Sequence, residues 1–118
     1  MQPLQITTFN TSSLSYEYVA IQNVSTQAIA MKPFMITDET PTQKRPHKFY
    51  FSEHAPDLVL APGHTVYVYT KKGTNLQAGT TMYVYWGRDA CVWNNNSDTI
   101  FLRDGDGRFE DVAYSKRR

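Results

Sequence analysis

Cysteine, net charge and long apolar runs are all scarce in this sequence of 118 residues, and each absence excludes a class of protein. The single cysteine, Cys91, permits no disulfide within the chain and disfavours a zinc site built on cysteine. Twelve basic against eleven acidic residues leave a net charge of +1, so no overall field favours nucleic acid or a membrane surface. No stretch approaches the roughly 20 apolar residues of a membrane helix. The N-terminal segment MQPLQITTFN lacks the pattern of a signal peptide, so we expect no membrane insertion and, if Met1 is the native start, a cytoplasmic protein.

Helix signals are also nearly absent, because apolar residues do not recur at the three- and four-residue spacing of an amphipathic helix. Instead, β-branched and aromatic residues alternate with polar residues in short runs. The predicted strands are residues 16–23, 28–38, 47–51, 64–70, 82–86, 99–103 and 108–114. Short strands separated by turns at intervals of about ten residues indicate a single all-β domain, an antiparallel β-sandwich. A content of 41% hydrophobic residues is sufficient for one core.

Proline and glycine mark the points where these strands bend or end. Pro33 has no N–H for a strand ladder, so it predicts a bulge, a bend or a sheet edge. Pro62 and Gly63 predict a type II turn in which Gly63 takes a positive φ. Residues 71–81 are predicted to form a polar loop.

The segment from Trp93 to Tyr114 predicts a β-hairpin that closes the domain. Ile100 and Leu102 alternate in its first strand, and the sequence Asp-Gly-Asp-Gly at 104–107 supplies the reversal. Paired carboxylates around glycine suggest calcium, but an EF-hand loop needs a further ligand position and a distal bidentate Glu at the right spacing. We therefore interpret these residues as a turn and expect no metal and no cofactor.

Catalytic motifs are missing as well. His47, His54 and His64 are scattered, and no nucleophile motif such as GxSxG occurs. We therefore predict no catalytic residues and a protein that is not an enzyme. A catalytic pair of Cys91 with a histidine is the weaker alternative.

Several motifs, taken in order, resemble those of the lamin-tail domain, an immunoglobulin-like β-sandwich. The residues that carry the resemblance are Glu17, Val19, Ile21, Asn23, Met31, Phe34, Ile36, Asp38, Pro62, Gly63, Val66, Val68, Trp93, Asn94, Asp98, Ile100, Leu102, Asp104 and Gly107. Pro33 stands where the family usually has Gly, Phe34 where it has Trp, and Ser97 where it has Gly before Asp. The resemblance implies a lamin-tail-like sandwich over residues 16–115, preceded by an edge strand or flexible segment at 1–15 and followed by a basic tail at 116–118.

Six residues of this pattern are expected to be structural. Phe34 and Trp93 are large enough to fill the space between two sheets, because such side chains bury about 150–250 Å² each. Asp98 and Asp104, like Asn23, stand at predicted strand ends, where short polar side chains bond to nearby backbone. Asn94 and Gly107 complete the closing pattern of the family.

The resemblance implies a non-enzymatic binding or structural module. Domains of this family occur at the ends of nuclear filament proteins and, in prokaryotes, attached to nucleases, hydrolases and surface proteins. We therefore expect an adaptor for an unidentified protein partner, acting through loops, a sheet face or strand addition at a sheet edge, as a monomer or weak homo-oligomer.

Two groups of side chains are candidate contact sites. If Tyr67, Tyr69, Tyr83 and Tyr85 share an outer face, they form an aromatic platform for sugars, bases or a partner protein. Tyrosine pairs that merely stabilise the sheet are the simpler alternative.

The second group consists of basic residues in loops and at the C-terminus. Contacts from these residues to phosphates would give a salt-sensitive association with DNA, whereas loop and tail solubility is the simpler alternative. The group comprises Lys44, Arg45, Lys48, Lys71, Lys72, Lys116, Arg117 and Arg118.

Overall fold

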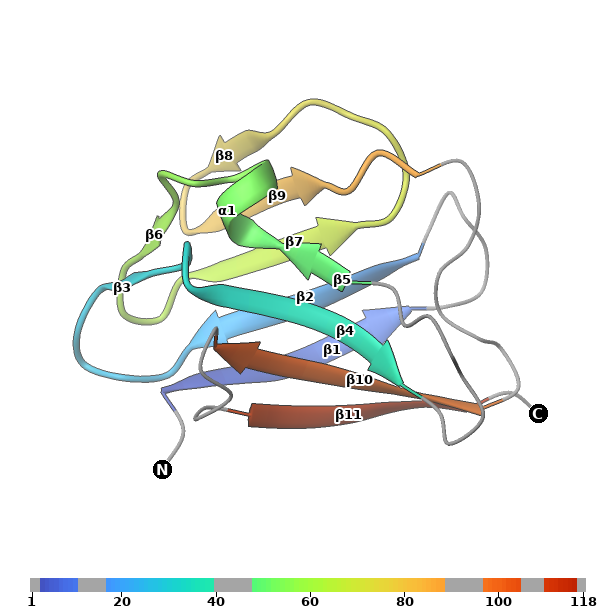
Figure 1. Ribbon diagram of the computed structural model, residues 1–118. Helices are drawn as coiled ribbons and strands as arrows, with labels where there is room; N and C mark the ends of the chain where they lie inside the picture. The colour runs from blue at the N-terminus through green and yellow to red at the C-terminus, as the bar shows by residue number, and fades with distance from the viewer. Residues whose placement is uncertain (1–2, 11–16, 40–47, 89–96, 105–109, 117–118) are drawn as a thin grey trace.

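The computed structural model of the chain describes residues 3–10, 17–39, 48–88, 97–104 and 110–116, whose strands form two packed sheets (Figure 1). The five-stranded sheet has the order β1 (Leu4–Asn10), β2 (Tyr18–Asn23), β7 (Thr65–Tyr69), β9 (Thr81–Tyr85) and β8 (Leu76–Ala78). The four-stranded sheet has the order β11 (Glu110–Lys116), β10 (Ser97–Asp104), β4 (Phe34–Glu39) and β5 (Lys48–Tyr50). A small pair, β3 (Ile29–Ala30) with β6 (Val59–Leu60), and one helical turn, α1 (Phe51–His54), complete the described structure. The predicted all-β, immunoglobulin-like fold is confirmed.

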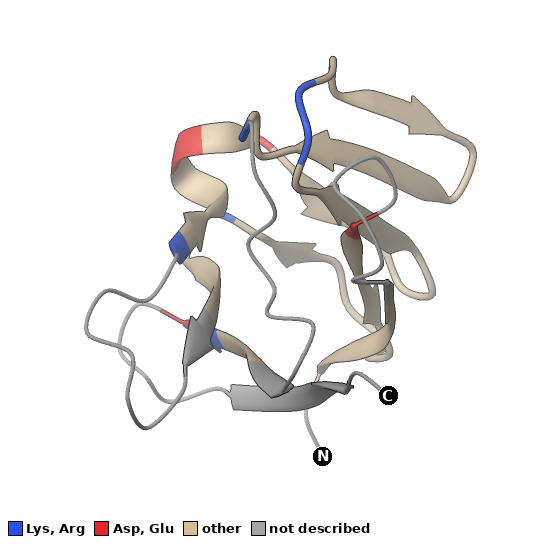
Figure 2. Ribbon diagram, turned by 90° about the vertical axis from the view of Figure 1, so that its right-hand side faces the viewer, with Lys and Arg blue, Asp and Glu red and all other residues tan. Residues whose placement is uncertain are grey.

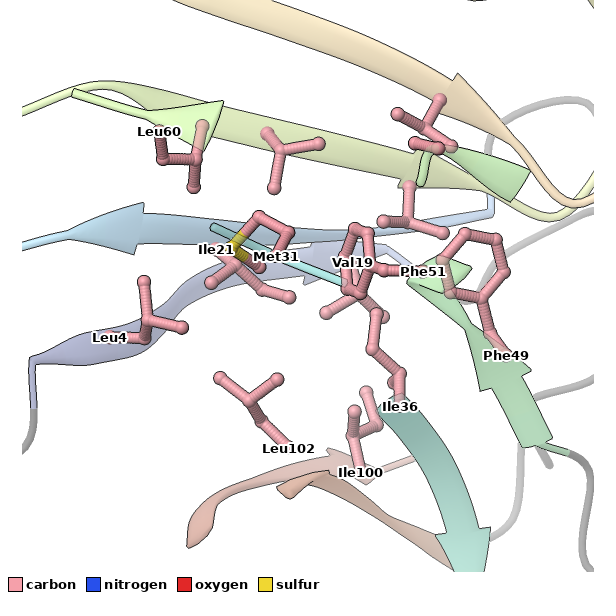
Figure 3. Packing of buried hydrophobic residues seen from close by; sticks show 14 residues of the cluster. Leu4, Val19, Ile21, Met31, Ile36, Phe49, Phe51, Leu60, Ile100 and Leu102 are labelled. Atoms are coloured by element: carbon pink, nitrogen blue, oxygen red, sulfur yellow. The ribbon is translucent and has the colours of Figure 1, made fainter. Parts of the chain in front are cut away.

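Apolar side chains at alternate positions of the facing strands form the core between the sheets (Figure 3). Ile100 and Leu102, predicted to share one face of their strand, are both fully buried. They lie opposite Val19 and Ile21 of β2, which are buried to the same degree. The period of two that the sequence shows is therefore the period with which each strand divides its side chains between core and surface.

One side of the sandwich is closed where the first and last strands meet. β1 is the edge of the five-stranded sheet, β11 is the edge of the four-stranded sheet, and the two lie next to each other (Figure 1). β1 pairs antiparallel with β2, and Leu4 at its start is fully buried in the core. The edges on the opposite side are β8 and β5.

One strand pair departs from the expected antiparallel arrangement, because β7 and β9 run parallel. The cause is β8, a strand of three residues within the segment predicted to be a loop. The chain leaves β7, forms β8 at the sheet edge, reverses at Gly79 and returns as β9 between β8 and β7. All three residues of β8 are exposed and the run is only three residues long, so the sequence pattern does not indicate this strand.

The predicted strand at 28–38 is divided into β3 and β4. The division is a turn in which the N–H of Phe34 donates to the carbonyl of Met31 at 2.9 Å, and Pro33 lies within it. The bend expected at Pro33 is therefore present, and it transfers the chain from the small strand pair to the four-stranded sheet.

The predicted strand at 47–51 is wrong at its end, because Phe51 begins α1. The N–H of Ala55 donates to the carbonyl of Phe51 at 2.8 Å and closes the turn. Phe49 and Phe51 were expected to lie on the same side of one strand. Although Phe51 is not in the strand, both side chains are fully buried. Their rings meet edge to face with centroids 5.0 Å apart.

The type II turn predicted at Pro62 and Gly63 is confirmed. Gly63 has φ +80°, and the N–H of His64 donates to the carbonyl of Ala61 at 3.0 Å. The main chain of Asn23 holds this turn, because its N–H donates to His64 at 3.0 Å and its carbonyl accepts from Gly63 at 2.8 Å. The end of β2 and the start of β7 are thereby fixed to each other.

The side chain of Asn23 is fully buried and ties three segments together. Its Nδ2 donates to the carbonyls of Gln27 and Leu60, each at 2.8 Å. Its Oδ1 accepts from the N–H of Ser25 at 2.9 Å and from the Ser25 hydroxyl at 2.7 Å. The expectation that Asn23 fixes a strand end through backbone hydrogen bonds is borne out.

We predict that Asn23→Ala lowers the free energy of unfolding by about 2–3 kcal/mol, because the buried carbonyl of Leu60 would lose the donor that Asn23 supplies. Urea denaturation followed by tryptophan fluorescence measures the change. Gln22→Ala is the matched control, since its side chain makes an exposed hydrogen bond to the carbonyl of Gly63 at 3.2 Å. That variant is expected to change stability by less than about 0.5 kcal/mol. Equal losses in the two variants would contradict the role of Asn23.

Candidate functional site

Five tyrosines from three neighbouring strands lie on the outer surface of the five-stranded sheet. Alternation along β7 turns Val66 and Val68 into the core and leaves the tyrosines between and after them on the opposite face. We call this group the tyrosine face; its members are Tyr18 of β2, Tyr67 and Tyr69 of β7, and Tyr83 and Tyr85 of β9. All five side chains are half-buried.

The parallel register of β7 and β9 aligns the tyrosines in pairs. Tyr67 lies beside Tyr83 with ring centroids 5.6 Å apart and planes inclined by 26°. Tyr69 lies beside Tyr85 at 5.5 Å and 21°. The rings are therefore stacked side by side, with the face of each ring turned toward its neighbour.

Tyr18 extends the tyrosine face onto β2. Its ring is tilted against Tyr67 at 5.3 Å and against Tyr69 at 5.5 Å. Ala20, the next residue of β2 on this side, lies opposite Tyr67 and is fully buried. A small residue at this position leaves room for the tyrosine rings that cover it.

Residues after β7 complete the margin of the tyrosine face. The amino group of Lys71 lies 5.5 Å from the centroid of the Tyr69 ring, a distance suited to a cation–π contact. Gly73 passes so close to Tyr85 that a Cβ at this position would lie 2.5 Å from Cδ2 of the ring. Leu76 of β8 lies directly opposite Tyr83 and is 58% exposed, so an apolar side chain borders the rings.

The environment of Tyr69 changes its acid–base behaviour. Burial raises the pKa of Tyr69 above its ordinary value of 10.0, and the four neighbouring tyrosines raise this pKa further. A phenolate here would be poorly solvated and would be repelled by neighbouring phenolates, so the neutral, hydrogen-bonding form is favoured.

The four tyrosines predicted as an aromatic platform are thus brought together on one face. Tyr18 was not among them. Alternation in β2 places Tyr18 on the other face of the strand from the buried Val19, and this pattern could have identified it. Whether these rings bind a partner stays a prediction.

The predicted basic contacts do not form one group among the described residues (Figure 2). Lys48 is exposed on β5 of the four-stranded sheet, whereas Lys71 and Lys72 follow β7 of the other sheet. Lys116 ends β11, and its side chain lies outside the described part. The remaining members also lie outside the described residues: Lys44, Arg45, Arg117 and Arg118.

The residues expected to be structural are described in part. Phe34 begins β4 and packs against the core, and Asp104 ends β10. Asp98 belongs to β10, where its backbone is paired with Ser115. Trp93, Asn94 and Gly107 lie outside the described residues, and their roles stay predictions.

The described part of the chain contains neither a cluster of metal-binding side chains nor a helix suited to a membrane. Within it, no three His, Cys, Asp or Glu side chains come together as a metal site. Nor does any described helix have the length and apolar character needed to cross a membrane.

We predict that Tyr69→Phe removes a late phase of tyrosine ionisation, above the ordinary pKa of 10.0, measured by the ultraviolet absorbance of phenolate on raising the pH. Because the pKa of Tyr69 is higher in the folded chain than in the unfolded one, its contribution to stability is complete below about pH 10. That contribution is lost as the pH rises through the folded pKa. Tyr50→Phe, on β5 of the other sheet, should keep the late phase. A late phase that survives in Tyr69→Phe would contradict the assignment.

Comparison with known proteins agrees with this architecture. The family model described as Lamin Tail Domain matches residues 2–116, nearly the whole chain. A search of the curated proteins found none that matches. The family is one of non-catalytic, immunoglobulin-like domains that serve as structural or binding modules. The resemblance inferred from the motifs is confirmed, and the chain belongs to the lamin tail domain family.

Proposed function

We propose that this protein is a non-enzymatic adaptor that holds a protein partner on the tyrosine face. The observation that carries the proposal is the placement of five half-buried tyrosines in mutual contact on one face of a regular sheet. Tyrosine offers large contact area and a polar hydroxyl at a small cost in side-chain entropy, which is why it is frequent at protein interfaces.

The orientation of the rings favours a protein over a sugar or a base. Sugars and bases stack on the open face of an aromatic ring. On this sheet, the faces of Tyr67 and Tyr83 are turned toward each other, as are those of Tyr69 and Tyr85. The stacked rings carry phenol hydroxyls and are bordered by the exposed side chain of Leu76. A mixed apolar and hydrogen-bonding surface of this kind matches the core of a protein interface.

We propose that the chain acts as a monomer or weak homo-oligomer and performs no bond chemistry. The second part of this proposal, the lack of bond chemistry, is supported by the two described histidines, because His54 belongs to α1 and stacks on Phe49, whereas His64 follows the turn at Gly63.

The proposal predicts that Tyr67→Ser and Tyr83→Ser each reduce capture of the partner by at least about fivefold, since each removes a ring from the centre of the tyrosine face. The experiment is quantitative affinity capture from a lysate of the source organism, followed by mass spectrometry. Tyr50→Ser is the matched control, because Tyr50 is an exposed tyrosine that belongs to the four-stranded sheet. A protein captured equally by wild type and by both tyrosine-face variants, with their melting temperatures unchanged, would contradict the proposal.

The alternative function is association with DNA through the basic residues. The specific observation in its favour is Lys71, whose amino group lies beside the tyrosine face and is followed in sequence by Lys72. It predicts binding that weakens as salt is raised, and that is lost when residues 116–118 are removed or when Lys71 and Lys72 are both replaced by Gln. Absence of DNA binding at low salt would rule this function out.

A further inference from the structure

We propose that a groove between β6 and β8 binds an extended, basic and apolar segment of a partner protein, which pairs with the free edge of β8. The groove is a second surface, lined by none of the residues of the tyrosine face. The proposal rests on the proposed adaptor function only in taking a protein as the partner.

The groove lies between the α1–β6 segment and the β8–β9 hairpin and has a volume of about 430 Å³, within the range of ligand sites. Leu58, Val59 and Met82 supply apolar side chains, and Gln77 lines it from β8. Asn75 bridges one end: its Nδ2 donates to the carbonyl of His54 at 3.0 Å, and its Oδ1 accepts from the N–H of Tyr85 at 3.2 Å. This bridge holds α1 and the hairpin on opposite sides of the groove.

The N–H and carbonyl of Gln77 point away from β9, toward the free edge of the sheet. The residues that flank β9 show which main-chain groups point to β7. The carbonyl of Thr80 accepts from the N–H of Thr65, and the N–H of Trp86 donates to the carbonyl of Tyr69. The N–H and carbonyl groups of even-numbered residues of β9 therefore point to β7 as well. The N–H and carbonyl groups of odd-numbered residues of β9 therefore point to β8, where Tyr83 is paired with Leu76.

Gln77, the residue between the two bonded positions of β8, then turns its N–H and carbonyl away from β9. Within the described part of the chain, β8 has no strand on that side. An edge of this kind is a template for another strand.

Val59 shows the same pattern on β6. The carbonyl of Leu58 accepts from the N–H of Met31 at 3.0 Å, so these residues form a bonded position of the antiparallel pair. Val59 lies at the next position and turns its N–H and carbonyl away from β3. Its side chain is 55% exposed. Gln77 and Val59 lie on opposite sides of the groove, and the N–H and carbonyl of each point away from its paired strand.

These features define the chemistry of the occupant. The outward N–H and carbonyl of Gln77 match an extended peptide, which can pair along a sheet edge while alternate side chains enter the groove. The lining includes the apolar side chains of Leu58, Val59 and Met82, and Met82 is an unbranched side chain that adapts to different shapes. Among the described residues of the lining, Asp57 is an exposed carboxylate, and neither Lys nor Arg is present. A segment that alternates apolar and basic residues complements this surface.

The test uses random linear peptides displayed on phage and selected on the full chain. We expect enriched sequences that alternate apolar with Lys or Arg residues. The enriched peptide is synthesised with a fluorophore, and its affinity is measured by anisotropy. Gln77→Pro should weaken binding by at least about fivefold, because proline removes the outward N–H that the peptide would use. It leaves the bonds of β8 to β9 in place, since that N–H does not face β9.

Gln77→Ala is the matched control and should bind as well as wild type, because it keeps the main-chain donor. Tyr67→Ser should also bind normally, so failure of the groove and failure of the tyrosine face are distinguishable. Any one of three results would overturn the proposal: no enriched peptide, equal binding of a peptide N-methylated along its pairing edge, or equal binding by a folded Gln77→Pro. A dimer that Gln77→Pro dissociates in sedimentation would instead assign this edge to a second copy of the chain.

Discussion

The pairing of β2 with β7 is the constraint on which the rest of the structure depends, because it is held at both ends. At one end, the hydroxyl of Thr70 donates to the buried carboxylate of Glu17 at 2.6 Å, and the N–H of Thr70 donates to the Glu17 carbonyl at 3.2 Å. At the other end, the main chain of Asn23 is bonded to both Gly63 and His64. A slip of one residue would break both ends and would turn the valines of β7 outward and its tyrosines into the core.

The register of β2 and β7 determines which side chains lie together on the outer face of the sheet. With β7 in place, parallel pairing aligns each tyrosine of β9 with one of β7, and the small Ala20 of β2 lies beneath the rings. The same placement of β9 leaves β8 at the edge, where Gln77 lines the groove and turns its main chain away from β9. The tyrosine face and the groove are thus two consequences of how the segment after β7 returns to the sheet.

The sequence predicts what depends on local alternation and turn chemistry. Val66 and Val68 against Tyr67 and Tyr69 could be assigned to two faces because strand side chains alternate strictly. The turn at Gly63 followed from the positive φ that a type II turn needs. These features require no knowledge of distant parts of the chain.

Features that depend on distant pairing were not predictable in this way. β8 has three exposed residues and exists as a strand because β9 lies beside it. The parallel direction of β9 follows from that insertion and has no local signature. Phe51 alternates with Phe49 as in a strand, yet it begins a helical turn, and both rings lie in the core. Alternation in β2 assigns Tyr18 to the outer face, but only the pairing of β2 with β7 brings its ring against Tyr67 and Tyr69.

The central claim is that the registers of β2, β7 and β9 place the tyrosines together on the outer face. Nuclear Overhauser contacts between selectively labelled tyrosine rings test it most directly. The structure predicts contacts of Tyr67 with Tyr83 and Tyr18, and of Tyr69 with Tyr85, with no contacts from these rings to the methyl groups of Ile36 or Leu102 in the core. Contacts between a β9 tyrosine and those core methyl groups, or the absence of both ring pairs, would contradict it.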